Sequence, residues 1–595
     1  MNPLQRLGLI MLPWGLASAV QGAAATKTQL KTEAEKSQWK KTGRFAEVEK
    51  FCEILPKSFP DQVTCEKFGV TPEGRPMLAF IAGEKSYLKP EKNRNRPVVL
   101  FQGGIHAGEI DGKDAGLVFL REILEGKRLP SILQKTTLVF VPVFNVDGHE
   151  RFGKNNRPNQ VGPEEMGWRT TAQNFNLNRD YLKVDAPEMR AMLDLLNTWD
   201  PLVYVDLHVT DGAQFQHDIA VMVEPSLAGP EALKNAGAQL SNDIMRDLKA
   251  AGNKPLWFYP SFAVDDDPTS GISARPQSAR FSNGYWAQRN RLGVLVETHS
   301  WRDYAHRVQS TIATLDSIVK EAAENGQTWR TAANEADQQA SQLAGKTVNL
   351  SYKNSDKVET IDFLGYEYKR RPSEISGQLM TVYNPKKNAV WAMPLRKEVL
   401  PDLQLAAPPA GYVIPAAYRE IFEPRLKAHR IQFSELKQSE EALAQVYRIS
   451  EVKLSSSSYE KHQRAEYKGQ WHEGTEKIGP GALWIPIAQP AAALIMQLLE
   501  PESSDSLLAW GFMNEIFERK EYMEAYVAEE VARDMLKDPA VRKEFDKKLA
   551  EDPAFAKSAQ QRLDFFARRH ASFDQNVNRY PILRLQKIPQ KLSTT

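Results

Sequence analysis

The chain has 595 residues, of which 42% are hydrophobic and 26% are charged, as is ordinary for soluble globular proteins. This length exceeds what one compact core supports, so we expect two or more domains. The formal net charge of +2 is spread over interspersed acidic and basic residues, and therefore gives no indication of nucleic-acid or membrane binding.

The N-terminus, MNPLQRLGLIMLPWGLASAVQG, has the order of a secretory signal. It begins with a basic residue, Arg6, continues through an apolar run and ends in small residues. The apolar run is too short for a comfortable membrane span, and a buried first helix is the alternative interpretation. We expect a signal peptide at residues 1–22 and an exported protein, periplasmic or secreted, with no stable membrane span after signal removal.

The only two cysteines, Cys52 and Cys65, lie in one short segment. In an exported protein they can close into a disulfide, and two unpaired thiols are the alternative. No recognisable motif offers either one a histidine partner, so we expect no thiol catalysis.

From about residue 94 the chain alternates apolar runs with longer amphipathic stretches. Such continuous apolarity is typical of strands buried on both faces. Strand alternating with helix predicts an α/β fold with a mixed, mostly parallel central sheet flanked by helices. With a helix and a strand pair leading into it, this domain is expected at residues 38–325. The predicted strands are 96–104, 136–145, 201–209, 218–224 and 292–300, and the predicted helices are 113–125, 187–198 and 229–251.

The pattern changes after residue 326. A polar helical or linking stretch is followed by short strand-like pieces, which predict a β-containing region at 346–485. From residue 488 onward, apolar residues at three-to-four spacing predict helices over 488–595. We interpret residues 346–595 as an accessory C-terminal region without catalytic residues, because no His, Cys or acidic residues gather there at metal-ligand spacing.

Two of the predicted strands end in metal-ligand residues. The stretch VVLFQGGIHAGEIDGKDAG presents His106 and then Glu109 after a glycine turn, and PLVYVDLHVTDG ends with His208. Ligands of open α/β sheets collect at the carboxyl ends of the strands, so these three side chains are expected at one rim. Two imidazoles and one carboxylate, with a fourth position open to water, form the ligand set of a catalytic zinc site. Alone, H-x-x-E recurs by chance, and Glu109 could simply cap the following helix.

Further polar residues extend this set. Glu297 ends the last central strand in GVLVETHSW, where a carboxylate is costly to bury unless it acts as a base or joins an ion pair. MGWRTTAQNFNLNRDYLK supplies Arg169, which can stabilise an oxyanion, and the adjacent Asn178 and Arg179, which can clamp a carboxylate. Taken singly, each arginine could be a solvated surface residue.

In their chain order, these elements resemble the zinc metallocarboxypeptidase family, which contains the pancreatic carboxypeptidases. The resemblance consists of the H-x-x-E motif, the W-R pair at Trp168 and Arg169, the N-R pair, the strand-end histidine and the final glutamate. It covers roughly residues 40–325 and suggests a bacterial-type member with a C-terminal extension.

The resemblance implies a mechanism and roles for the residues. One Zn²⁺ per chain would be bound by His106, Glu109 and His208. Glu297 would be the general base that deprotonates the metal-activated water, and Arg169 would stabilise the oxyanion. The implied activity is hydrolysis of peptide bonds with release of C-terminal residues.

The implied partner is a peptide or protein with a free C-terminal carboxylate, which Asn178 and Arg179 would bind. Two positions depart from the family pattern. Asn176 stands where members often carry an aspartate partner of the first histidine, and its amide accepts a hydrogen bond but has no charge. Tyr285 lies closer to Glu297 than the family's mobile tyrosine would, so we assign it no catalytic role.

Other classes of protein remain possible. The stretches GGIHAGE and DLHVT also resemble the aspartoacylase and succinylglutamate desuccinylase group, which cleaves N-acyl amino acids. The W-R pair, the length of the chain and the expected signal favour a peptidase. An N-acyl amino acid amidohydrolase, a zinc endopeptidase acting on peptidoglycan peptides and an inactive binding module stay as alternatives.

Overall fold

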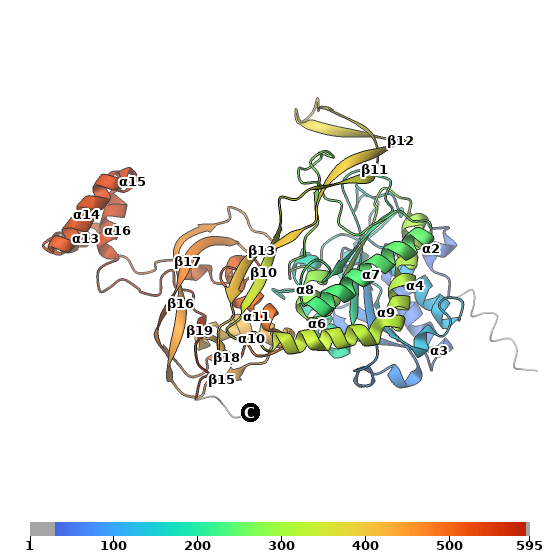
Figure 1. Ribbon diagram of the computed structural model, residues 1–595, viewed down its shortest axis with the longest axis horizontal. Helices are drawn as coiled ribbons and strands as arrows, with labels where there is room; N and C mark the ends of the chain where they lie inside the picture. Colours follow the sequence, from blue (N-terminus) through green and yellow to red (C-terminus); the bar gives the residue numbers. More distant parts are fainter. Residues whose placement is uncertain (1–29, 591–595) are drawn as a thin grey trace, which may run out of the picture.

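The computed structural model of the chain describes residues 30–590 (Figure 1). The signal peptide expected at residues 1–22 lies outside these described residues. Within them, none of the helices is long and apolar enough to cross a membrane.

A mixed eight-stranded sheet lies at the centre of the N-terminal half of the described chain. Its strands are β1 (Val63–Val70), β2 (Pro76–Ala82), β3 (Val98–Gly103), β4 (Thr137–Val141), β5 (Val203–Val209), β6 (Ile219–Glu224), β7 (Pro255–Leu256) and β9 (Leu292–Thr298). The order is β1-β2-β4-β3-β5-β9-β6-β7, and the central strands β4, β3, β5 and β9 run parallel. Every residue of β3, β4, β5, β6 and β9 is buried, as their continuous apolarity predicted. The predicted fold class is confirmed.

Helices cover both faces of this sheet. In this half they are α2 (Glu33–Lys36), α3 (Phe45–Ser58), α4 (Asp111–Leu124), α5 (Val146–Glu150), α6 (Pro187–Trp199), α7 (Glu231–Ala250), α8 (Ser282–Gln288) and α9 (Tyr304–Ala340). On one face α4 and α7 pack against α9, and Gly112 of α4 comes so close to β5 that a Cβ there would lie 2.6 Å from Leu207 Cβ. On the other face, Trp286 of α8 packs edge-on against Tyr204 of β5. Alternating strand residues thus contact opposite helical layers.

A disulfide joins Cys52 of α3 to Cys65 of β1, with Cα atoms 5.3 Å apart. Of the two states that the sequence left open for these cysteines, the structure has the bonded one. The bond attaches α3 to the edge strand of the central sheet, where the helix also packs.

The second half begins within α9, which runs 15 residues past the expected domain end at 325. Its first strands are β10 (Thr347–Asn354), β11 (Glu359–Pro372), β12 (Leu379–Arg396) and β13 (Val399–Ala406). β11 and β12 form a hairpin that projects at the top of Figure 1, and β10 pairs with β13. The base of β12 pairs with β8 (Ile272–Ser273), so the hairpin is anchored to a loop of the first half.

A second sheet of six strands follows in the described C-terminal region. Its strands are β14 (Gly411–Ile414), β15 (Ser434–Glu435), β16 (Glu440–Leu454), β17 (Ala465–Ile478), β18 (Leu483–Ile485) and β19 (Leu583–Leu585). Strands are followed by helices as predicted, but the end of the segment expected to be helical returns as β19 between β14 and β16. Three residues are too few to show a sequence period.

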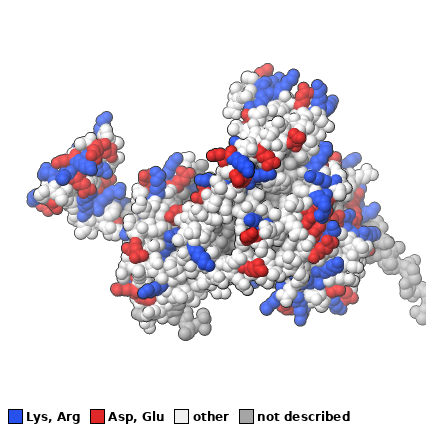
Figure 2. Space-filling view, viewed as in Figure 1, with Lys and Arg blue, Asp and Glu red and all other residues white. Residues whose placement is uncertain are grey.

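The helices of this half fall into two groups, α10–α12 and α13–α16. They are α10 (Arg419–Ala428), α11 (Ala492–Leu499), α12 (Leu507–Trp510), α13 (Ala525–Met535), α14 (Pro539–Glu551), α15 (Pro553–Lys557) and α16 (Ala559–Ala567). Helices α13–α16 form a small bundle at the left of Figure 1, with a core of its own around Phe555, Phe565 and Phe566. On the face shown in Figure 2, acidic and basic side chains are intermixed over this bundle.

Apart from that bundle, the two halves share hydrophobic core clusters. The same cluster of buried side chains includes Val294 of β9 and Tyr412 of β14. Polar contacts reinforce the junction, as where the hydroxyl of Tyr285 lies 2.9 Å from Nδ1 of His429. The C-terminal region is therefore packed against the α/β half.

Candidate active site

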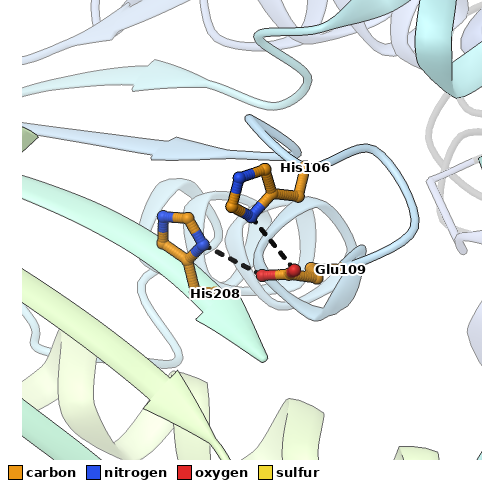
Figure 3. Close-up of side chains that lie close together, drawn as sticks. All are labelled: His106, Glu109 and His208. Carbon is orange, nitrogen blue, oxygen red and sulfur yellow. Dashed lines mark hydrogen bonds and ion pairs between the residues drawn. The ribbon is translucent and has the colours of Figure 1, made fainter. Parts of the chain in front are cut away.

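The carboxyl ends of β3 and β5 bring three metal-ligand side chains together. His106 and Glu109 lie in the turn between β3 and α4, and His208 lies near the end of the neighbouring parallel strand β5. Nδ1 of His106 is 3.0 Å from one oxygen of Glu109, and Nδ1 of His208 is 2.9 Å from the other. Figure 3 shows the two imidazoles approaching the carboxylate from different sides. All three residues are buried, and their ligand atoms lie within 4.8 Å of one another.

The outer nitrogen of each imidazole lies beside an oxygen atom. Nε2 of His106 lies 2.9 Å from Oδ1 of Asn176, and Nε2 of His208 lies 2.9 Å from Oδ2 of Asp206. Oδ1 of Asn176 also accepts the backbone N–H of Asn178 at 3.1 Å, which identifies it as the acceptor of the amide. For His106, the contact with Asn176 places the proton of the neutral ring on Nε2 and leaves the Nδ1 lone pair directed inward. Nδ1 of His208 is also directed inward and lies at hydrogen-bond distance from Glu109.

The inner atoms therefore fit a cation. Nδ1 of His106 is a buried nitrogen without a hydrogen bond in the described residues, although Glu109 lies beside it. The lone pair of this nitrogen and the carboxylate beside it repel one another unless positive charge lies between them. Two histidines and one glutamate with room for a further ligand are the donor set of a catalytic zinc ion. The three side chains that the sequence predicted as ligands therefore fit a zinc ion.

Electrostatics favour the metal-binding forms of His106 and Glu109, but favour the protonated form of His208. Burial lowers the pKa of His106 to about 4, so this ring is neutral. Burial opposes ionisation of Glu109, but Arg157 and His106 hold the pKa of its carboxyl well below the ordinary value. For His208, burial is outweighed by Asp206 and Glu109, which raise its pKa, and a bound cation would compete with that proton.

Glu297 lies beside this cluster on β9, in register with His208. It is only 7% exposed, and burial, together with the charges of Glu109 and Asp206, raises its pKa to about 8. In the part of the chain that the structure describes, no hydrogen bond or ion pair engages its carboxylate. The structural ion pair considered from the sequence is therefore absent there, and the carboxylate is available for chemistry.

Two arginines contact the same oxygen of Glu109. Nη1 of Arg169 lies 3.0 Å from Oε1, and the side chain of Arg169 is 36% exposed, so it reaches the cluster from the surface. Nη1 of Arg157 lies 2.7 Å from Oε1, and its Nη2 donates to the backbone carbonyls of Val209 and Thr210. Arg157 was not predicted, and no motif in the sequence marks it.

The N-R pair lies next to the cluster on η4, a short 3-10 helix (Leu177–Arg179). Asn178 is buried, with Oδ1 accepting the backbone N–H of Ser282 at 3.3 Å and Nδ2 lying 3.5 Å from Nε2 of His208. Arg179 is half-buried, and its guanidinium lies 4.6 Å from the centre of the Phe281 ring. All seven predicted side chains thus lie in one region. His106, Glu109 and His208 form the cluster. Arg169 and Asn178 contact it, Glu297 lies in register with His208, and Arg179 is adjacent.

Two tyrosines near the site have different surroundings. Tyr285 is buried against Tyr181, with its hydroxyl on His429, and does not reach the ligand cluster. Burial and the negative charges of Glu297 and Asp211 raise the pKa of Tyr259 well above its ordinary value. Tyr259 lines a cavity of about 420 Å³ together with Asp211 and was not predicted.

The α/β fold and a two-histidine, one-carboxylate centre with a free glutamate beside it define a metallohydrolase. Comparison with known proteins gives the family. A family model described as zinc carboxypeptidase matches residues 48–370, just over half of the chain. The chain belongs to this family and is accordingly a zinc metallocarboxypeptidase, a hydrolase that acts on peptides.

Individual relatives are distant. The chain is 22% identical to carboxypeptidase 2 of Trichophyton rubrum over 473 residues, covering 74% of this chain and 78% of the relative. It is 32% identical over 126 residues to an inactive metallocarboxypeptidase of Saccharomyces cerevisiae, covering 19% of this chain and 28% of that protein. The solved metallo-carboxypeptidase from Burkholderia cenocepacia matches 47% of this chain and 68% of its own, at 15% identity and a TM-score of 0.35.

Proposed function

We propose that the chain releases C-terminal residues from peptides or proteins, using one zinc ion bound by His106, Glu109 and His208. The observation that carries this proposal is the convergence of these three ligands beside Glu297, whose buried carboxylate has no other partner in the described residues. Zinc, when bound there, makes water more acidic and polarises the scissile carbonyl. One relative is inactive by name, and the proposed activity of this chain rests on its own residues.

Glu297 is the proposed general base. Its position beside His208 lets it take a proton from the attacking water and deliver that proton to the leaving nitrogen. Arg169 is the proposed oxyanion partner, because its guanidinium already contacts Glu109 and is exposed enough to turn towards a substrate. A positive charge at that point stabilises the negative charge that develops on the scissile oxygen.

Arg179 and Asn178 are the proposed anchor for the terminal carboxylate. Nε and Nη1 of Arg179 are hydrogen-bonded, but in the described residues Nη2 has no such partner and can donate to a ligand. Nδ2 of Asn178 has only a long contact in the described residues, 3.5 Å to Nε2 of His208. A carboxylate bound by both groups would receive charge-assisted hydrogen bonds.

A panel of free, C-terminally amidated and N-acylated substrates tests this function by mass spectrometry. We expect stepwise release of single residues from free peptides and almost none from amidated ones. Arg179→Ala should lower kcat/KM on free peptides at least about tenfold, because a charged contact is lost. Equal cleavage of free and amidated peptides would instead identify an endopeptidase, and cleavage of N-acyl amino acids alone an amidohydrolase. His106→Ala and His208→Ala should each abolish zinc binding.

We further propose that the protein is exported and that residues 38–325 form the catalytic domain, with residues 346–595 accessory. The signal-like segment 1–22 and the disulfide between Cys52 and Cys65 both suit an oxidising compartment. N-terminal sequencing after expression in an exporting host should find a mature chain that starts after residue 19 or 22. A chain still starting at Met1 would refute export.

A further inference from the structure

The turn between β16 and β17, residues 455–464, reaches from the C-terminal sheet to the candidate site. The hydroxyl of Tyr459 accepts a hydrogen bond from Nε of Arg179 at 3.1 Å. Next to it, Oε2 of Glu460 accepts the backbone N–H of Asn176 at 3.0 Å. Asn176 is the residue that accepts the hydrogen bond from His106. Two adjacent residues of the turn thus contact the proposed carboxylate anchor and the partner of a proposed metal ligand.

Residues on both sides of the turn contact the rest of the protein. Nε2 of His462 lies 2.7 Å from Oδ2 of Asp185, a buried carboxylate that also contacts Lys183 and Arg425. The ring of Tyr459 stacks almost parallel on Trp510, with ring centres 5.9 Å apart and an angle of 8° between the planes. The phenol is therefore held in place by groups other than Arg179.

The backbone of the turn is in an unfavourable conformation. Tyr459 and His462 exchange two backbone hydrogen bonds, of 2.8 and 3.1 Å, around Glu460 and Lys461. These two residues have φ angles of +50° and +76°, a left-handed region that usually requires glycine or asparagine in such tight turns. Residues with larger side chains persist there only when their surroundings fix them, and such strain gathers at functional sites. The contact of Glu460 with Asn176 and the contact of His462 with Asp185 stabilise this conformation.

Tyr459 retains an unused donor. Its oxygen accepts from Arg179, so the hydroxyl hydrogen is left over, and no other group in the described residues takes it. Tyr459 as a whole is 41% exposed and can meet a ligand. Nη2 of Arg179 is also unused, as shown above. A carboxylate has two oxygens and can accept from a phenol and a guanidinium at once.

We propose that Tyr459 is a substrate-binding residue, whose hydroxyl donates to the C-terminal carboxylate held by Arg179. The accessory region then contributes one wall of the substrate site and part of its selectivity for free C-termini. This inference rests on the proposed function. It also assigns a site residue to residues 346–595, where the sequence led us to expect none.

Tyr459→Phe in the full-length, zinc-loaded protein tests this, because it removes the hydroxyl and keeps the ring on Trp510. We expect kcat/KM on a free peptide to fall about tenfold, mainly through KM, since the contact is a hydrogen bond to a charged group. The slow cleavage of the amidated peptide, the zinc content and the melting temperature should not change. Tyr526→Phe is the matched control, because Tyr526 is 71% exposed on α13, and it should behave as wild type.

The remaining outcomes overturn the inference in distinguishable ways. If Tyr459→Phe matches wild type while Arg179→Ala loses activity on free peptides, Tyr459 does not bind substrate and the proposed function stands. If Tyr459→Phe raises kcat/KM, the phenol competes with substrate for Arg179. Equal losses on free and amidated peptides would show a structural role. If wild type itself cleaves both peptides equally, the proposed function fails, and this inference fails with it.

Discussion

Replacing Glu297 by glutamine separates proton transfer from metal binding, and the chain contains a matched control for it. Glu224, on the neighbouring strand β6, is 6% exposed, and burial also raises its pKa to about 8. The two glutamates lie at opposite ends of the β6–β9 pair, since Glu297 pairs with Ala220 and Glu224 with Gly293. Four residues of strand separate the two levels by about 13 Å. Both changes replace a buried carboxyl by an amide of the same shape.

The structure sets the expected size of each effect. A general base contributes roughly 10²–10⁴-fold, so Glu297→Gln should lower kcat at least about a hundredfold, equivalent to about 3–5 kcal/mol. Zinc should remain, because Glu297 is not among the clustered ligands. Stability should not fall, because the carboxylate makes no hydrogen bond or ion pair in the described residues. Glu224→Gln should leave kcat within about twofold.

The assay measures kcat at saturating free peptide, zinc by elemental analysis and melting temperature on both variants and wild type. Retention of more than about a tenth of wild-type kcat by Glu297→Gln would refute its role as the base. A comparable loss of kcat in Glu224→Gln would show that any buried carboxyl of this sheet matters equally. Loss of zinc in Glu297→Gln would make it a ligand or a support of one.

Two further predictions concern pH and zinc affinity. The native pKa of Glu224 lies above its unfolded value, so the folded protein retains a proton that the unfolded chain releases between about pH 4.5 and 8. Stability from this group is present at low pH and is lost as the pH rises through that window, by about 3–5 kcal/mol. Glu224→Gln should therefore be more stable than wild type in urea at pH 8.5 and equal to it at pH 4, and equal stabilities at both pH values would contradict this. Asp206→Asn should weaken zinc binding about 10–100-fold in chelator competition, because Asp206 orients His208, and an unchanged affinity would contradict that role.

Much of the α/β half was predictable from local pattern. Strands such as Val98–Gly103 and Leu292–Thr298 are buried on both faces, so their sequences are continuously apolar and stand out. Polar residues that interrupt such runs are costly unless they have a role, which is why His208 and Glu297 could be selected. Because parallel strands end at the same rim, these residues could also be placed together without knowing the strand order.

Other parts of the site had a weaker signal or none. Asp206 lies two residues before His208 on β5, and alternation along a strand puts both on one face, so this pair could have been found. Arg157 lies in an irregular loop, where no period relates it to Glu109. The state of Cys52 and Cys65 depended on whether α3 packs beside β1, which composition does not determine.

The contact between Tyr459 and Arg179 joins residues 280 positions apart, and a pattern confined to one element cannot report it. The sequence does contain Glu460 and Lys461 where a tight turn would favour asparagine and glycine, but that mismatch becomes visible only once the backbone is known. A mismatch of this kind persists when the rest of the fold compensates for it, here through Asn176 and the shared hydrophobic core. Since that core spans both halves, the C-terminal region is part of the enzyme's structure, and a substrate-binding role for its turn is a consequence of how the halves pack.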